Sequence, residues 1–142
     1  MAELHALESA LVYIEQHYME QMTLDDLIRV SGVSKYSLNR LFKKRFQMSP
    51  KRWIWIFRVA VAKQVFSCWP DLACRDVAFA CGFETPAHFS RVFRAIVGET
   101  PQDYKNKLAE EKNSDLDDQA AITLFARRAF LNQELGLVDG FN

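Results

Sequence analysis

The stretch TLDDLIRVSGVSKYSLNRLFKKRF, residues 23–46, decides the fold of this chain. Thr23 and Asp26 have the spacing of a capping box at the start of a helix, and acidic residues there suit the helix dipole. Gly32 can adopt the positive φ of a tight turn, and Ser34 is a suitable N-cap for a further helix over 34–46. A short helix, a glycine-containing turn and a second capped helix form the outline of a helix-turn-helix.

The same outline occurs a second time, about fifty residues further along the chain. LNRLFK at 38–43 aligns with FSRVFR at 89–94, Gly32 aligns with Gly82, and SPKRW at 49–53 aligns with TPQDY at 100–104. In each copy Ser or Thr precedes a Pro at the first helical position, where the missing N–H costs nothing, and Thr85-Pro86 repeats the device. The repeat predicts two related helix-turn-helix units.

Helical spacing dominates the whole sequence, and no segment alternates like a strand, so the expected fold class is all-α. We expect two homeodomain-like three-helix subdomains joined by a long linker helix, with Leu4, Leu7, Leu11, Ile14 and Tyr18 on the apolar face of a first helix at about 4–18. The expected bounds are 1–55 for the first subdomain, 50–67 for the linker helix, 68–108 for the second subdomain, and 109–142 for an acidic linker and an extra C-terminal helix.

The net charge of zero conceals a strong asymmetry along the chain. Residues 1–26 contain six acids and no Lys or Arg, whereas residues 27–70 contain ten Lys or Arg and no acid. A long acid-free stretch of this kind supplies affinity for phosphates without a basic overall pI. The charge pattern therefore favours a nucleic acid as the partner.

Several classes of protein are disfavoured by the residues present. Cys68, Cys74 and Cys81 lack paired spacing and the histidines are scattered, which predicts buried thiols rather than a disulfide or a metal site. No phosphate loop, HExxH or nucleophile elbow occurs, so we expect neither an enzyme nor a cofactor. No apolar run spans a bilayer and no leader pattern is present, so we expect a cytoplasmic, nucleoid-associated protein.

On the helix at 34–46, the spacing predicts that Leu38, Leu41 and Phe42 are core residues. The opposite face carries side chains suited to a major groove, because Arg pairs bidentately with guanine, Asn with adenine, and Lys with phosphates. These side chains are Tyr36, Arg40 and Lys43, with Asn39 and Lys44 on the flanks.

On the matching helix at about 86–96, the predicted buried stripe is Phe89, Val92, Phe93 and Ile96. Its outward face is Ala87, Arg91 and Arg94, with His88 and Ser90 at the sides. Fewer basic groups lie here, and Glu84 is close in sequence. We therefore expect the first unit to supply most of the affinity and sequence discrimination.

The segment GFETPAHFSRVFRAIVGETPQDYK, residues 82–105, resembles the signature of the AraC/XylS family of bacterial transcription activators. That signature is Gly-Phe, then Phe-x-x-x-Phe, then Gly-x-(Ser/Thr)-Pro-x-x-Tyr-(Arg/Lys), and the resemblance covers about residues 4–107. It implies a monomer, similar to the small stand-alone members, that lays two recognition helices into successive major grooves of double-stranded DNA and contacts RNA polymerase. Gln47 departs from the family, which usually has Gly there.

The resemblance assigns a role to individual positions. It implies base contacts from Tyr36, Asn39, Arg40, Ala87, His88 and Arg91. Contacts to DNA phosphates are expected from Ser34, Lys35, Lys43, Lys44, Ser90 and Arg94.

Two alternatives remain open from the sequence. The chain could be a protein-binding adaptor or anti-regulator that has kept the fold and binds RNA polymerase or another regulator. The predicted extra helix at about 119–135 has Ile122, Phe125, Ala126, Ala129 and Phe130 on one face. That face could pack back onto the domain, or it could form a surface for a partner or for a dimer.

Overall fold

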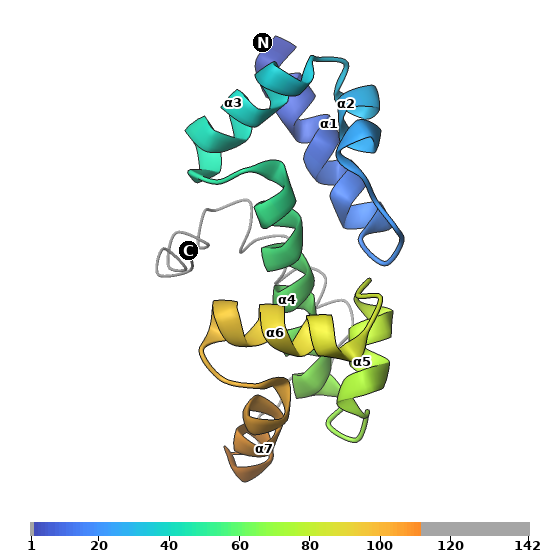
Figure 1. Cartoon of the computed structure of the whole chain (residues 1–142), viewed down its shortest axis with the longest axis vertical. Coiled ribbons are helices and arrows are strands. Elements are labelled where there is room, and N and C mark those ends of the chain that lie inside the picture. The colour runs from blue at the N-terminus through green and yellow to red at the C-terminus, as the bar shows by residue number, and fades with distance from the viewer. Residues whose placement is uncertain (1, 112–142) are drawn as a thin grey trace. The chain divides into compact units, whose positions relative to one another are not determined.

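The computed structural model describes residues 2–111, and over this range the chain is all-α, as predicted. The helices are α1 (Ala2–His17), α2 (Leu24–Ser31), α3 (Lys35–Phe46), α4 (Pro50–Cys68), α5 (Cys74–Ala80), α6 (Pro86–Val97) and α7 (Pro101–Glu111) (Figure 1). The acidic linker and the extra helix predicted at about 119–135 lie outside the described residues.

The chain divides into two compact units within α4, between Trp55 and Ile56. The N-terminal unit contains α1, α2, α3 and the first residues of α4. The C-terminal unit contains the rest of α4 with α5, α6 and α7. Each unit therefore carries one of the two helix-turn-helix outlines seen in the sequence.

The turn between α2 and α3 forms by the predicted local chemistry. At the start of α2, the Thr23 N–H donates to Asp26 Oδ2 (3.0 Å) and the Asp26 N–H donates to Thr23 Oγ1 (3.2 Å). Gly32 follows α2 at φ 75°, in the left-handed region that glycine enters without strain. Ser34 then accepts the N–H of Ser37 and begins α3.

The core of the N-terminal unit lies between α1, α2, α3 and the start of α4. Leu27 and Leu38 are fully buried, and the rings of Phe42, Phe46 and Trp53 pack together with centroids 5.3–6.1 Å apart. This aromatic cluster fixes the base of α3, so the opposite face of that helix must point outward.

The expected apolar face of α1 was partly wrong. Leu7 and Ile14 are buried, but Leu4 is 65% exposed, and Ala6 and Ala10 take part in the core instead. The two alanines, one turn apart, lie on the face that packs against α2 and α3. Leu4 lies in the first turn of α1, before the first buried residue of that helix.

The C-terminal unit is built on a larger aromatic cluster, in which Phe66, Phe83, Phe89, Phe93 and Tyr104 contact one another with centroids 5.0–6.3 Å apart. The predicted stripe of α6 is narrower than expected, because Val92 and Ile96 are only half-buried. Both residues lie three positions after a buried phenylalanine, on the same edge of the stripe.

The three cysteines form no disulfide. Cys81 is buried, and burial raises the pKa of its thiol to about 12. Cys68 and Cys74 are only half-buried, so the prediction of buried thiols holds for Cys81 alone.

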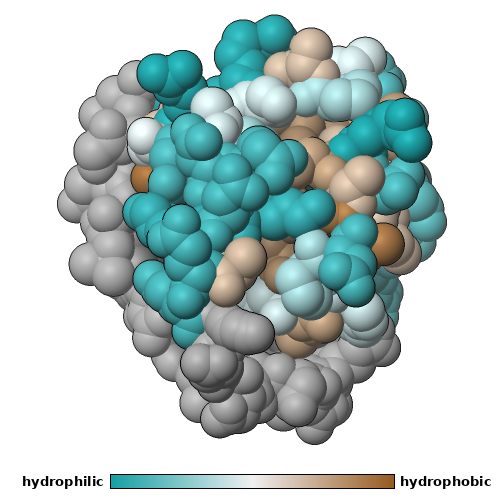
Figure 2. All heavy atoms as spheres, turned by 90° about the horizontal axis from the view of Figure 1, so that it is seen from below, coloured by the Kyte–Doolittle hydropathy of each residue, from teal (hydrophilic) through white to brown (hydrophobic). Residues whose placement is uncertain are grey.

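One face of the described residues is largely polar. Viewed from below, the coloured surface is mainly hydrophilic, with smaller apolar areas between the polar side chains (Figure 2). Within residues 2–111, no helix combines the length and the apolar character that crossing a membrane requires.

Candidate nucleic-acid interface

Helix α3 has a buried and an exposed face, as the sequence predicts. Leu38, Leu41 and Phe42 are buried. Tyr36 on the opposite side is 75% exposed, and Arg40, Lys43 and Lys44 are also exposed. An aromatic ring and three cations therefore occupy the outward surface of α3.

The start of α3 presents polar groups held in place by local hydrogen bonds. Ser34 Oγ lies 3.1 Å from Ser37 Oγ, and the Asn39 side-chain amide donates to the Lys35 carbonyl at 3.0 Å. This bond uses the Asn39 Nδ2 group, and Asn39 is half-buried. The amide nitrogen carries two hydrogens, so this bond leaves one of them and Oδ1 for pairing with a base.

Arg40 is engaged by an acidic side chain from another helix. Its Nη2 donates to Glu3 Oε2 of α1 at 3.0 Å. The hydrogen bond and the positive charge of Arg40 lower the pKa of Glu3 below its usual value, and Lys44 adds a smaller effect in the same direction. The outward face of α3 is therefore partly neutralised by one carboxylate.

The C-terminal end of α3 is strongly basic. Lys43, Lys44 and Arg45 fill its last turn, where cations interact favourably with the helix dipole. The Arg45 guanidinium lies over the Phe46 ring, 5.3 Å from its centroid. Lys43 and Lys44 are exposed, so they can interact with phosphates.

Helix α6 occupies the equivalent place in the C-terminal unit. Thr85 caps it by accepting the His88 N–H at 3.1 Å, and Pro86 is its first residue. Ala87, Ser90, Arg91 and Arg94 are exposed, as predicted for the outward face.

His88 differs from its exposed neighbours. It is half-buried, and its ring packs edge-on against Phe83 with the centroids 5.7 Å apart. Part of this imidazole therefore contributes to the packing of the C-terminal unit, which limits how far it can extend toward a ligand.

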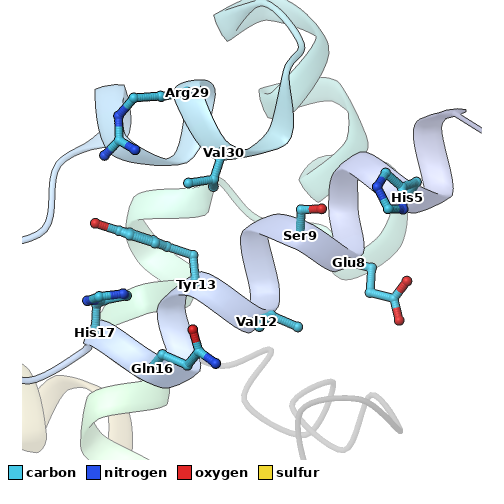
Figure 3. Close-up of a pocket in the computed structure, with 9 residues that line it drawn as sticks. All are labelled: His5, Glu8, Ser9, Val12, Tyr13, Gln16, His17, Arg29 and Val30. Atoms are coloured by element: carbon cyan, nitrogen blue, oxygen red, sulfur yellow. The ribbon is translucent and has the colours of Figure 1, made fainter.

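A separate groove lies between α1 and α2 in the N-terminal unit (Figure 3). The Tyr13 ring packs on His17, with the centroids 4.1 Å apart, and the Arg29 guanidinium carbon lies 6.0 Å from the centre of the Tyr13 ring. The groove is lined by His5, Glu8, Ser9, Val12, Tyr13, Gln16, His17, Arg29 and Val30. None of the residues predicted to contact DNA is among them, so the groove is distinct from the outward face of α3.

Sequence reasoning missed one residue of this interface, Glu3. It lies 37 positions from Arg40, and no spacing rule connects two residues on different helices. The only available signal was that α1 and α3 belong to the same three-helix unit. Within residues 2–111, no group of three His, Cys, Asp or Glu residues could hold a metal ion.

Residues 27–107 match a family model described as a helix-turn-helix domain, which defines a class of DNA-binding protein. A solved AraC-type transcriptional regulator from Chromobacterium violaceum is 27% identical and has a TM-score of 0.69, over 75% of this chain and 95% of that chain. The chain therefore belongs to the AraC/XylS family, and residues 27–107 form a DNA-binding domain of that type.

Curated relatives of the chain are transcription regulators. GbdR of Pseudomonas aeruginosa is 32% identical over 97 residues, which are 68% of this chain and 26% of that protein. PocR of Salmonella typhimurium is 28% identical over 107 residues, which are 75% of this chain and 35% of that protein. The chain thus spans about a third of the length of such relatives.

A second solved structure shares the fold. The DNA-binding domain of the global transcriptional factor AdpA, solved in complex with a target DNA, is 24% identical and has a TM-score of 0.69. The match covers 75% of this chain and 95% of that domain.

Proposed function

We propose that this chain binds double-stranded DNA in a sequence-specific manner and regulates transcription, with α3 and α6 entering adjacent major grooves. One observation carries the proposal. The outward face of α3 presents Tyr36, Arg40 and Lys43 opposite a buried stripe, within a stretch that contains no acid from residue 27 to 70. The structure of AdpA with its target DNA supports the use of this fold in DNA binding.

On α3, Arg40 is proposed to pair with a guanine, Asn39 to read an adenine, and Tyr36 to pack on a thymine methyl group or reach a phosphate. The hydroxyl and ammonium groups around them position the helix on the backbone without reading sequence. In the proposed complex these backbone contacts come from Ser34, Lys35, Lys43 and Lys44.

On α6, Arg91 is proposed to make the main base contact, with Ala87 and His88 beside it and with Ser90 and Arg94 on the phosphates. This helix has fewer cations than α3, and His88 is held against Phe83. The N-terminal unit is therefore proposed to provide most of the sequence discrimination.

This asymmetry is tested by titrating DNA with Arg40→Ala and Arg91→Ala proteins. Loss of a bidentate guanine contact costs about 1–3 kcal/mol, so Arg40→Ala should weaken binding to the preferred site about tenfold or more, and Arg91→Ala should weaken it less. Lys107→Ala, an exposed position on α7, is the control and should change little. Equal losses at the two arginines, or a larger loss at Arg91, would reject the asymmetry.

The protein is further proposed to activate transcription by contacting RNA polymerase. This contact is proposed to take place on the nucleoid. RhaS of Yersinia pestis, which carries the description of a transcriptional activator, is 26% identical over 102 residues, which are 72% of this chain and 37% of that protein. Transcription in vitro from a promoter with the preferred site, with and without this protein, tests the proposal. A decrease in transcript would show repression instead.

Selection of bound sequences from a random duplex library, followed by salt titration of the best binder, tests the function as a whole. Two conserved blocks about one helical turn apart are expected, with affinity that falls steeply with log salt. A single block would leave α6 with backbone contacts only. Weak, salt-insensitive binding without enrichment would contradict the proposal and favour a protein-binding role.

A further inference from the structure

We propose that Glu3 is a specificity-determining residue that acts as an intramolecular counter-ion for Arg40. Its carboxylate occupies the guanidinium until a guanine displaces it, and this suppresses binding to DNA of the wrong sequence. The inference rests on the proposed function, because it assumes that Arg40 faces DNA.

The geometry places the carboxylate on the face proposed to read bases. Glu3 Oε2 accepts from Arg40 Nη2 at 3.0 Å, and the side chains of Arg40 and Glu3 are 45% and 56% exposed. An ion pair this open to solvent is weak enough to be exchanged for another partner. α1 packs against α3, and this contact places Glu3 beside Arg40.

The charge distribution makes Glu3 distinctive within the described residues. The basic stretch from residue 27 to 70 contains no acid, so any carboxylate on this face must come from outside it. Glu3 also lies within electrostatic reach of Lys44, and Arg40 and Lys44 both lower the pKa of its carboxyl below the usual value.

A guanine base and a backbone phosphate differ in how well they can displace this carboxylate from Arg40. Guanine offers two acceptors, N7 and O6, that match the fork of a guanidinium, so it can replace the single hydrogen bond to Glu3. A phosphate can also pair with the fork of a guanidinium, but unlike guanine it carries a full negative charge, which the nearby carboxylate of Glu3 repels. Arg40 therefore remains paired with Glu3 on random sequence and pairs with guanine on the preferred site.

The test compares the wild-type protein with its Glu3→Gln variant, which keeps the shape of the side chain and removes its charge. On a random-sequence duplex the variant should bind about two- to fivefold more tightly, as expected for release of an exposed ion pair. The slope of log affinity against log salt should steepen by about 0.9, because Arg40 gains one phosphate. Affinity for the selected site should rise less, so the ratio of specific to random binding falls.

Two controls isolate the pair. In the Arg40→Ala background, Glu3→Gln should have a much smaller effect on random-sequence binding, because only the weaker interaction with Lys44 remains. The four proteins form a double-mutant cycle that measures the coupling between Glu3 and Arg40. Glu8→Gln, which removes the same charge from the groove between α1 and α2, should leave the specificity ratio unchanged. Unfolding of each variant, followed by circular dichroism, confirms that the fold is retained.

The possible outcomes distinguish the counter-ion role of Glu3 from other roles of this residue, and from failure of the proposed function. If Glu3→Gln weakens binding, Glu3 positions Arg40 for DNA and the counter-ion role is wrong. An equal effect with and without Arg40 would show a general charge effect and also overturn the proposal. If the wild-type protein shows no salt-dependent DNA binding, the proposed function itself fails, and the Glu3 role fails with it.

Discussion

Gln47 has a backbone conformation that usually belongs to glycine. It ends α3 at φ 59° and ψ 30°, in the left-handed region, and its N–H donates to the Lys43 carbonyl. Among residues 2–111 it is the one non-glycine residue with a positive φ. The AraC/XylS family usually has glycine at this position, and the left-handed backbone conformation of residue 47 gives the physical reason.

Replacement of Gln47 by Gly should therefore stabilise the protein. A non-glycine residue in the left-handed region costs roughly 1–2 kcal/mol, so we expect Gln47→Gly to raise the free energy of unfolding by about 1 kcal/mol in urea denaturation. Gln64→Gly, in the interior of α4, is the matched control and should lower it by a similar amount. A loss of stability at both positions would mean that the turn after α3 is not strained.

At the level of single residues, sequence reasoning worked where periodicity applied. Leu38, Leu41 and Phe42 were expected in the core and are buried, while Tyr36 and Arg40 were expected outside and are exposed. It could not find the Glu3–Arg40 pair or the packing of His88 on Phe83. Both contacts depend on tertiary structure, which helical periodicity does not encode.

At the level of helices, the bounds followed the capping signals. Thr23, Ser34 and Thr85 cap α2, α3 and α6, and these helices begin where the sequence predicts. The apolar face of α1 was less predictable, because its sequence offers alanines and leucines on neighbouring faces. Only the packing of α2 and α3 against it decides that Ala6 and Ala10 are covered and Leu4 is not.

The capping box of α2 predicts a dependence of stability on pH. Hydrogen bonds from Thr23 and Arg29 lower the pKa of Asp26 below its ordinary 3.8. A carboxylate with a lowered folded-state pKa stabilises the fold above its unfolded pKa, and this contribution is lost as the pH falls through the folded value. Wild-type stability relative to Asp26→Asn should therefore be constant from pH 7 to about 5 and shrink below about 4.

The measurement is thermal or urea unfolding of both proteins across that pH range. Asp25→Asn is the control, because Asp25 lies in the same first turn but makes no capping contact to Thr23. A difference between wild type and Asp26→Asn that persists unchanged at pH 3 would show that the capping box does not depend on the charge of Asp26.

At the level of the molecule, the internal repeat predicted two helix-turn-helix units, and the family comparison covers both of them. The charges, in contrast, are not repeated: α3 carries four exposed cations, whereas α6 carries two. A repeat constrains buried residues strongly, because both copies must pack a similar core. It constrains the outward face much less, so the two proposed reading helices can differ in chemistry.

The position of the cysteines makes the C-terminal unit observable by itself. All three cysteines lie after residue 56, and Cys81 is 1% exposed with a thiol pKa of about 12. Such a thiol reacts with a labelling reagent only when its surroundings open. The rate at which Cys81 is labelled therefore reports how often this unit opens transiently. The N-terminal unit contains no cysteine, so it does not contribute to the signal.

We expect Phe93→Ala to accelerate the labelling of Cys81 about a hundredfold or more, since such a truncation costs about 3–5 kcal/mol in a packed core. Leu27→Ala, in the core of the N-terminal unit, should leave the rate unchanged. Mass spectrometry of the labelled peptide distinguishes Cys81 from Cys68 and Cys74. A matching acceleration by both substitutions would mean that one opening event exposes the interiors of both units, so that damage to one half of the protein would be felt in the other.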